Sequence, residues 1–170
     1  MPDKLMLNDY FYIQLRQSVR LALPVENVTE VMTVSRSDIC PIPGVASALL
    51  GVVNQRGQLL WVVELADLLS DVLCLAPSPL QYRSREQLML AVLAGKPTPA
   101  TTAGAPPRLA CVVSSLKGVV PLNPAELKPI PASFSPAFSS FLSGMTEIEQ
   151  LSVAVLNVSA VFAAIRIVEK

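Results

Sequence analysis

Histidine is missing from this 170-residue chain. Histidine is the usual general base of nucleophilic triads and the commonest protein ligand of metals. Its absence excludes histidine-dependent triads, histidine–metal ligation and phosphotransfer onto histidine within these residues. The sequence also has no glycine-rich phosphate-binding loop and no evident pairing of a nucleophile with a base, so we expect neither an enzyme nor a bound cofactor.

Cysteine is scarce, and neither sign of charge is in excess. The three cysteines, Cys40, Cys74 and Cys111, lie far apart and form no Cys-x-x-Cys pair, so a zinc site is not expected. We expect buried free thiols in a reducing compartment. Thirteen basic residues balance thirteen acidic ones, which predicts neither a nucleic-acid-binding face nor a polybasic membrane anchor.

Long apolar runs are absent as well. The N-terminus lacks the basic-then-apolar order of a signal peptide, and no apolar run reaches the roughly 18 residues that span a bilayer. The nearest, 151–165, is interrupted by Ser152, Asn157 and Ser159. We therefore expect a cytoplasmic protein with no direct membrane insertion.

The chain is instead rich in short strand patterns. Apolar residues make up 52% of it and aromatic residues only 5%, so one domain, 1–170, can build its core from Val, Leu, Ile and Ala. Short apolar runs, most of them alternating, predict strands. These runs are 10–15, 21–25, 28–34, 52–53, 58–63, 87–93, 108–113, 117–122 and 151–158. A C-terminal helix is predicted at 159–167, with Ser159 as its N-cap.

The sequence contains an internal repeat. Arg20-Leu21-Ala22 and Pro41-Ile42-Pro43 recur 88 residues later as Arg108-Leu109-Ala110 and Pro129-Ile130-Pro131. From Gly51 onward the apolar positions recur 93 residues later, starting at Gly144. The repeat predicts two similar halves of about five strands each, and strands this short close into small barrels that leave few free edges.

One turn differs between the halves. Asn54-Gln55-Arg56-Gly57 reads as a four-residue connection between two strands, because Asn and Gly tolerate positive φ. Nothing in a turn requires Arg56, and the corresponding residues in the second half are Glu147-Ile148-Glu149-Gln150. The scaffold is repeated but the chemistry of the turn is not, which favours a function for Arg56. A solvated surface charge is the alternative interpretation.

These features resemble the CheW-like adaptor family of bacterial chemosensory systems over nearly the whole chain. The resemblance rests on five segments: Ala22-Leu23-Pro24-Val25, Val28-x-Glu30-Val31, Pro41-Ile42-Pro43-Gly44, Gly51-Val52-Val53-Asn54-Gln55-Arg56-Gly57 and Val62-Val63-Glu64-Leu65. The chain departs from the family pattern in a longer connection at 95–107, and in Cys111-Val112-Val113-Ser114, which has no Asp.

The resemblance implies a mainly β fold. Two SH3-like, five-stranded β-barrel subdomains would share a core, with short helices that include a C-terminal one. We place the subdomains at about 15–80 and 81–155, with the N- and C-terminal segments packing across them.

The resemblance also implies a non-catalytic adaptor that couples the cytoplasmic tips of chemoreceptors to the regulatory domain of a CheA-type histidine kinase. A chemotaxis, pilus-motility or phototaxis array would suit such an adaptor. The implied receptor-facing residues are Val28, Glu30, Met32, Gly51, Asn54 and Arg56, and the implied kinase-facing residues include Val119, Val120 and Met145.

A β-barrel that binds a small molecule or cofactor, and acts as an enzyme, is the alternative function. Paired carboxylates would be its acid–base candidates. Two pairs occur, Glu64 with Asp67 and Glu147 with Glu149. Each lies in a turn or beside a strand end, so we interpret both pairs as solvated surface.

Overall fold

The computed structural model describes residues 7–15, 20–44, 48–69, 87–95, 107–132 and 139–168. Cys74, Phe134, Phe138 and most of the connection 95–107 lie outside these ranges. The described strands are β1 (Asn8–Gln14), β2 (Arg20–Pro24), β3 (Val28–Ser35), β4 (Leu49–Gln55), β5 (Gln58–Glu64), β6 (Gln87–Ala94), β7 (Arg108–Val113), β8 (Ser115–Leu122), β9 (Leu142–Ile148) and β10 (Leu151–Leu156). The mainly β prediction is confirmed.

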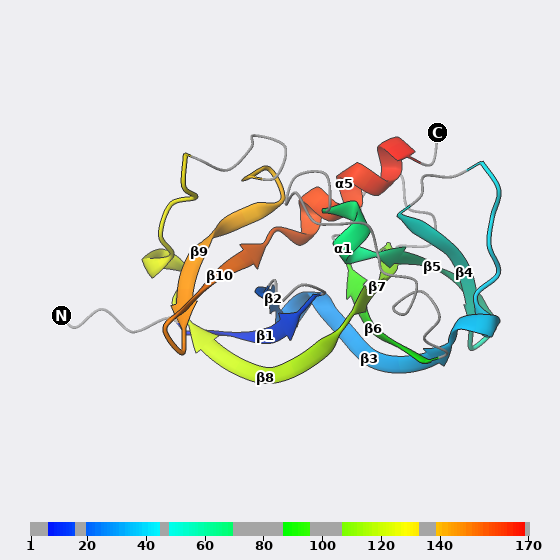
Figure 1. The fold of residues 1–170 in the computed structure, drawn as a ribbon, viewed down its shortest axis with the longest axis horizontal. Coiled ribbons are helices and arrows are strands. Elements are labelled where there is room, and N and C mark those ends of the chain that lie inside the picture. The colour runs from blue at the N-terminus through cyan, green and yellow to red at the C-terminus, as the bar shows by residue number, and fades with distance from the viewer. Residues whose placement is uncertain are drawn as a thin grey trace.

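The strands form two five-stranded sheets that lie side by side (Figure 1). The first sheet has the order β8-β1-β2-β10-β9, and the second has the order β3-β6-β7-β5-β4. The two orders match strand for strand when the repeat is applied. Each sheet also contains one parallel pair, β2 with β10 and β7 with β5, among otherwise antiparallel neighbours. The predicted repeat is therefore a repeat of tertiary structure.

The expected division of the chain at residue 80 differs from the sheets that form. Strands β6 and β7 belong with β3, β4 and β5, so the second sheet covers residues 28–113. The first sheet joins the N-terminal β1 and β2 to β8, β9 and β10. Because β2 and β7 each pair in parallel with a strand far away in the sequence, each barrel takes strands from both repeat units.

Each sheet curls until its outer strands approach one another. In the second sheet Cys40, just after β3, exchanges two backbone hydrogen bonds with Val52 of β4, at 2.8 and 2.9 Å. In the first sheet Lys128, just after β8, does the same with Met145 of β9. These bridges shield the edges of the barrels, which would otherwise offer unpaired backbone groups to other chains.

Glycine permits both bridges. A Cβ on Gly51 would lie 2.1 Å from the carbonyl oxygen of Cys40, and a Cβ on Gly144 would lie 3.2 Å from that of Lys128. In each barrel, the segment that carries Cys40 or Lys128 therefore passes closely over the neighbouring strand at its glycine. This is the one position at which both halves of the repeat have a glycine.

The core has three parts. One cluster fills the second barrel, and includes Val53, Leu60, Leu90 and Val112. A smaller cluster around Tyr10 and Tyr12 fills the first barrel. The largest cluster lies between the barrels and takes side chains from both sheets: Ile13, Leu21, Leu23, Val63, Leu93, Leu109, Cys111, Ala154 and Leu156. The shared core predicted for two subdomains is present.

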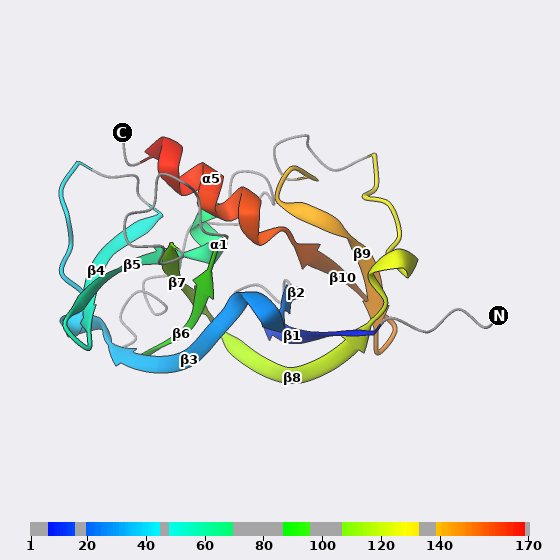
Figure 2. The ribbon, with the colours of Figure 1, turned by 180° about the vertical axis from the view of Figure 1, so that it is seen from behind.

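Two short helices cover this shared core. Helix α1 (Leu65–Leu68) follows β5, and α5 (Val158–Val168) follows β10 and extends from the centre of the molecule over the second barrel (Figure 2). Val161 of α5 is fully buried in the shared core. The predicted helix is confirmed but its predicted cap is wrong, because Asn157 Oδ1 accepts a hydrogen bond from the backbone N–H of Ala160 at 3.3 Å. Asn157, one residue before the helix, is the N-cap.

Two expectations about buried groups need correction. Cys111 is buried as expected, but Cys40 is exposed. Glu64, expected at the solvated surface, is only 3% exposed. It ends β5, and the parallel pairing of β5 with β7 places it beside Val112, one residue from Cys111. Burial raises the pKa of the Cys111 thiol, and the nearby Glu64 carboxyl raises it further.

Gly51 and Gly118 provide a matched test of the backbone crossing. Both have φ of +141°, which costs a residue with a side chain about 1–3 kcal/mol. A Cβ on Gly118 would meet nothing within 4 Å. We expect Gly118→Ala to lose only this strain, and Gly51→Ala to lose at least ~2 kcal/mol more of the free energy of unfolding. Urea unfolding measures both, and equal losses would contradict a role for the crossing.

The buried thiol predicts a loss of stability at alkaline pH. The pKa of Cys111 is higher in the folded than in the unfolded chain. Its contribution is therefore fully present below the pKa of an unfolded thiol, about 8.5, and is lost as the pH rises from there toward the folded pKa. Under reducing conditions, the free energy of unfolding should fall more steeply between pH 8.5 and pH 10 in the wild type than in Cys111→Ala. Equal slopes in the wild type and Cys111→Ala would contradict the prediction.

Candidate functional site

The connection between β4 and β5 is a two-residue turn, shorter than the four residues expected. Arg56 and Gly57 form it, with φ of +53° and +83°. Two successive positive φ values define a type I′ turn, which matches the right-handed twist of paired strands. Asn54 belongs to β4, and its Oδ1 accepts a hydrogen bond from the N–H of Gly57 at 3.0 Å. This bond ties the turn to the strand before it.

The equivalent turn of the other barrel has nearly the same backbone but the opposite charge. Glu149 and Gln150 connect β9 to β10 with φ of +53° and +67°. Neither Arg56 nor Glu149 is a residue that favours positive φ, which suits Asn, Asp and Gly. The scaffold is therefore the same in both turns, and the charged side chain that each one displays is not a requirement of the backbone.

Strand β3 directs one charged side chain inward. Glu30, Met32 and Val34 alternate with exposed residues, so these three face the barrel. The side chain of Glu30 is 28% exposed, near the end of the barrel. A half-buried carboxylate in this position needs hydrogen-bond donors and a positive charge to offset its lost hydration.

Donors reach Glu30 from three other elements. The Gln55 side-chain amide donates to Glu30 Oε1 and contacts Met32 Sδ at 3.6 Å. Arg108, at the start of β7, places Nη2 at 3.4 Å from Glu30 Oε1 and donates to Gln55 Oε1 at 2.6 Å. Arg56 Nη2 lies 3.9 Å from Glu30 Oε2. We call Glu30, Gln55, Arg56 and Arg108 the Glu30 cluster.

The Glu30 cluster brings together some of the predicted site residues. Glu30, Met32, Asn54 and Arg56 lie in or beside it. The Arg56 side chain is 84% exposed, so it is the part of the cluster most open to a partner. Two guanidinium groups face one carboxylate here, which makes the cluster net positive.

Sequence reasoning missed Gln55 and Arg108. Gln55 was assigned to the turn, but it is the last residue of β4 and only 9% exposed. The signal for Arg108 was the glutamate among apolar neighbours on β3, because an inward carboxylate implies a cation nearby. Which cation supplies the charge depends on the curl of the sheet, since Arg108 is 78 residues away from Glu30.

Val28 and Gly51 lie apart from the Glu30 cluster contacts. Val28 is partly buried and packs against the shared core. Gly51 is buried beneath the Cys40 carbonyl and offers no side chain. Both residues therefore contribute to the packing of the fold. That either of them contacts a partner stays a prediction.

The residues predicted in the second half point in different directions. Val119 is 53% exposed on the outer face of β8. Val120, its neighbour, faces the core of the first barrel. Met145 packs against the shared core, and its backbone bonds to Lys128. Only Val119 presents a large apolar side chain to solvent among these three.

The first barrel does not reproduce the Glu30 cluster. Gly118 occupies the position of Glu30, and Ile148 that of Gln55. Arg20, the repeat equivalent of Arg108, donates to the Tyr12 hydroxyl at 2.6 Å and lies over its ring, 5.7 Å from the centroid. The barrel that lacks a carboxylate at the position of Glu30 thus pairs its arginine with an aromatic side chain.

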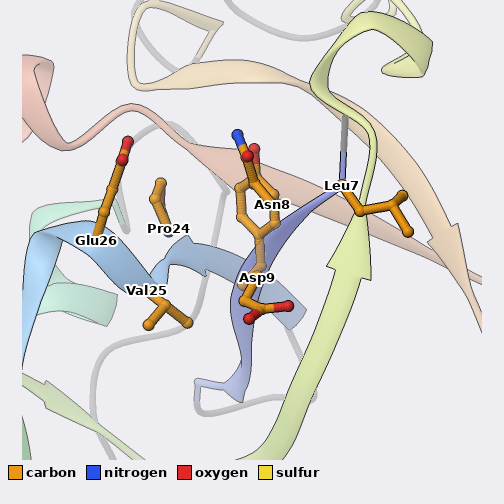
Figure 3. Close-up of a pocket in the computed structure, with 7 residues that line it drawn as sticks. Leu7, Asn8, Asp9, Pro24, Val25 and Glu26 are labelled. Atoms are coloured by element: carbon orange, nitrogen blue, oxygen red, sulfur yellow. The ribbon is translucent and has the colours of Figure 1, made fainter. Parts of the chain in front are cut away.

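A surface pocket of about 350 Å³ lies where the chain passes from β2 into the short turn 25–27. Figure 3 shows its walls, with Leu7, Asn8 and Asp9 at and just before the start of β1, Pro24 at the end of β2, and Val25 and Glu26 in the short turn that follows. Its charged walls are the carboxylates of Asp9 and Glu26.

Within the described ranges, no group of three or more cysteine or carboxylate side chains is placed to hold a metal ion. In the same ranges, no helix has the length and apolar character needed to cross a bilayer.

Known proteins resemble the chain in sequence pattern and fold. The family model described as "CheW-like domain" matches residues 9–166. The fold is similar to that of the crystal structure of scaffolding protein TtCheW from Thermoanaerobacter tengcongensis, with a TM-score of 0.66 and 15% sequence identity. That match covers 92% of this chain and 88% of the other, and it confirms the predicted two-subdomain, SH3-like fold. No curated protein sequence matches significantly.

The positive φ of the two turns predicts that the charged residues Arg56 and Glu149 lower the stability of the fold. Arg56 and Glu149 share φ of +53°, and Asn tolerates this conformation better. We expect Arg56→Asn and Glu149→Asn each to raise the free energy of unfolding, by ~0.5–1 kcal/mol. The ion pair that Arg56→Asn removes is mostly exposed and should cost little. Urea unfolding measures both variants, and a clear loss of stability in Arg56→Asn would assign the arginine a structural role.

Proposed function

This chain belongs to the CheW-like domain family, and from that premise we propose that it is a non-catalytic adaptor in a chemosensory array. It couples chemoreceptors to a CheA-type histidine kinase, in a chemotaxis, pilus-motility or phototaxis system. In this role it binds the cytoplasmic tip of a receptor with one part of its surface and the regulatory domain of the kinase with another. Binding, without any chemical step, is the activity.

One observation supports the receptor contact above the others. Arg56 stands on a rigid type I′ turn with 84% of its side chain exposed, although neither backbone nor core requires an arginine there. Arginine is common among the residues that dominate protein–protein contacts, because its planar guanidinium donates several hydrogen bonds at once. Glu30, whose side chain is 28% exposed, lies beside it and is the second charged residue expected near this contact.

The kinase contact is assigned to the first barrel. Val119 and Leu151 are exposed apolar residues of β8 and β10 in that barrel. Isolated exposed apolar residues are common on protein surfaces, so Val119, Val120 and Met145 are proposed from the resemblance. A large apolar side chain such as Val119 is the kind that interface cores bury.

Arg56→Asp tests the receptor contact. We expect it to weaken binding to a receptor-tip fragment by about 1–3 kcal/mol, because the reversed charge faces the partner and lies beside Glu30. Stability should change little, since the side chain is exposed. Glu149→Arg, a charge reversal on the equivalent turn, is the matched control and should leave receptor binding unchanged. Isothermal titration calorimetry measures the affinities, and thermal unfolding checks the fold.

Weak binding must be separated from none. Adaptor contacts of this type can be micromolar, so the titration should reach about millimolar concentrations of the receptor tip and of the kinase regulatory domain. An absence of binding to both at that concentration would end the adaptor proposal. A stoichiometric small molecule seen by native mass spectrometry would favour the alternative of a ligand-binding barrel.

A further inference from the structure

We propose that Arg108 is a positioning residue for the Arg56 turn. Arg108 neutralises Glu30 at the end of the barrel and thereby leaves the Arg56 guanidinium free to meet a partner. The proposal rests on the receptor contact proposed above for Arg56. It adds that Arg108 determines whether the Arg56 side chain is available for that contact. Arg108 comes from the other repeat unit, 52 residues after Arg56 in the chain.

The two oxygens of Glu30 face two different arginines. Oε1 accepts from the Gln55 amide and lies 3.4 Å from Arg108 Nη2. Oε2 lies 3.9 Å from Arg56 Nη2. The Arg108 side chain is 30% exposed and the Arg56 side chain 84% exposed. One arginine is thus held within the barrel end, and the other extends into solvent.

Unequal exposure decides which pair is stronger. A charge pair that is mostly solvated gains little, because water screens it and the side chain loses freedom in forming it. A pair that is more buried is screened less, and its loss leaves a carboxylate without compensation. Glu30 is therefore satisfied mainly by Arg108 and Gln55, and its hold on Arg56 is weak.

Other side chains keep Arg108 in place. Its guanidinium donates to Gln55 Oε1 at 2.6 Å and reaches Gln58 Oε1 at 3.5 Å. Its Nε is buried, with no hydrogen-bond partner among the described residues. Gln55 and Gln58 flank the turn on either side. Arg108 therefore braces both strands that carry Arg56, which a lysine could not do with a single ammonium group.

Removal of Arg108 should change the behaviour of Arg56. Among the described residues, Arg56 is then the cation that remains within 4 Å of Glu30. The half-buried carboxylate would draw the Arg56 guanidinium toward it. Arg56 would become less exposed and would have to break this pair before it could bind an acidic or polar group of a partner.

The repeat supplies a natural control. Arg20 begins β2 as Arg108 begins β7, but it bonds to the Tyr12 hydroxyl, and the position of Glu30 is taken by Gly118. Arg20→Met therefore removes the same type of residue from the same place in the other barrel. It should not affect Arg56.

The first measurement needs no partner. Nuclear magnetic resonance of the Arg56 side chain, in the Nε–H and guanidinium signals, reports whether the group rotates freely or is held in an ion pair. We expect slower rotation in Arg108→Met than in the wild type, and no change in Arg20→Met. Unchanged Arg56 signals in a folded Arg108→Met would overturn the proposal. Arg108→Gln carries the same expectation and serves if Arg108→Met does not fold.

The second measurement is a double-mutant cycle on receptor-tip binding. We expect Arg108→Met to weaken binding about three- to tenfold, and Arg108→Lys, which keeps the charge, to restore part of the loss. In a Glu30→Gln background there is no carboxylate to capture Arg56, so Arg108→Met should have no further effect. An equal loss in both backgrounds would mean that Arg108 acts by another route and would overturn the proposal.

The two proposals can fail separately. If the wild-type chain binds neither the receptor tip nor the kinase regulatory domain, the adaptor role fails, and the Arg56 signals still decide whether Arg108 positions the turn. If the receptor binds but the cycle shows independent effects, the adaptor role stands and the positioning role fails.

Discussion

Strands β2 and β7 are buried on both faces, so each of them has to fit two cores at once. In β2, Ala22 faces the first barrel while Leu21 and Leu23 face the shared core. In β7, Ala110 and Val112 face the second barrel while Leu109 and Cys111 face the shared core. A leucine buried this completely contributes roughly 2 kcal/mol relative to an exposed one. These strands therefore hold the two barrels together as well as holding each barrel closed.

The position of the Glu30 cluster follows from this arrangement. Because β7 is central in its sheet, its first residue, Arg108, lies at the end of the barrel where β3, β4 and β5 also converge. The curl of the sheet, secured by the bridge between Cys40 and Val52, brings the outer strand β3 close enough for Glu30 to meet Gln55 of β4. A rigid scaffold thus displays a charged turn at the end of a barrel, where a partner can reach it without disturbing the core.

Much of this could be predicted from the residues alone. The alternation in β3 placed Glu30 among apolar neighbours, and the repeat aligned Gly51 with Gly144 and predicted two similar halves. Other features depended on contacts between distant segments. Glu64 looked solvated because it ends a strand, yet its parallel neighbour β7 buries it. Ser159 looked like a helix cap, but the helix begins one residue earlier and Asn157 caps it. The division at residue 80 followed the order of the repeat, whereas hydrogen bonds between β2 and β10 and between β5 and β7 exchange strands between the units.

The sequence by itself determined most of the strands but not β9 (Leu142–Ile148), together with the repeat, the two-barrel architecture and the candidate importance of Arg56. Local periodicity and turn chemistry contain that information, because they depend on residues a few positions apart. Only the tertiary structure decided which strands share a barrel, and that Arg108 and Gln55 surround Glu30. Those contacts join residues 25 to 78 positions apart, and they exist because a curled sheet brings its outer strands together. The charged turn can thus be identified from the sequence, whereas the residues that position it are identified only from the fold.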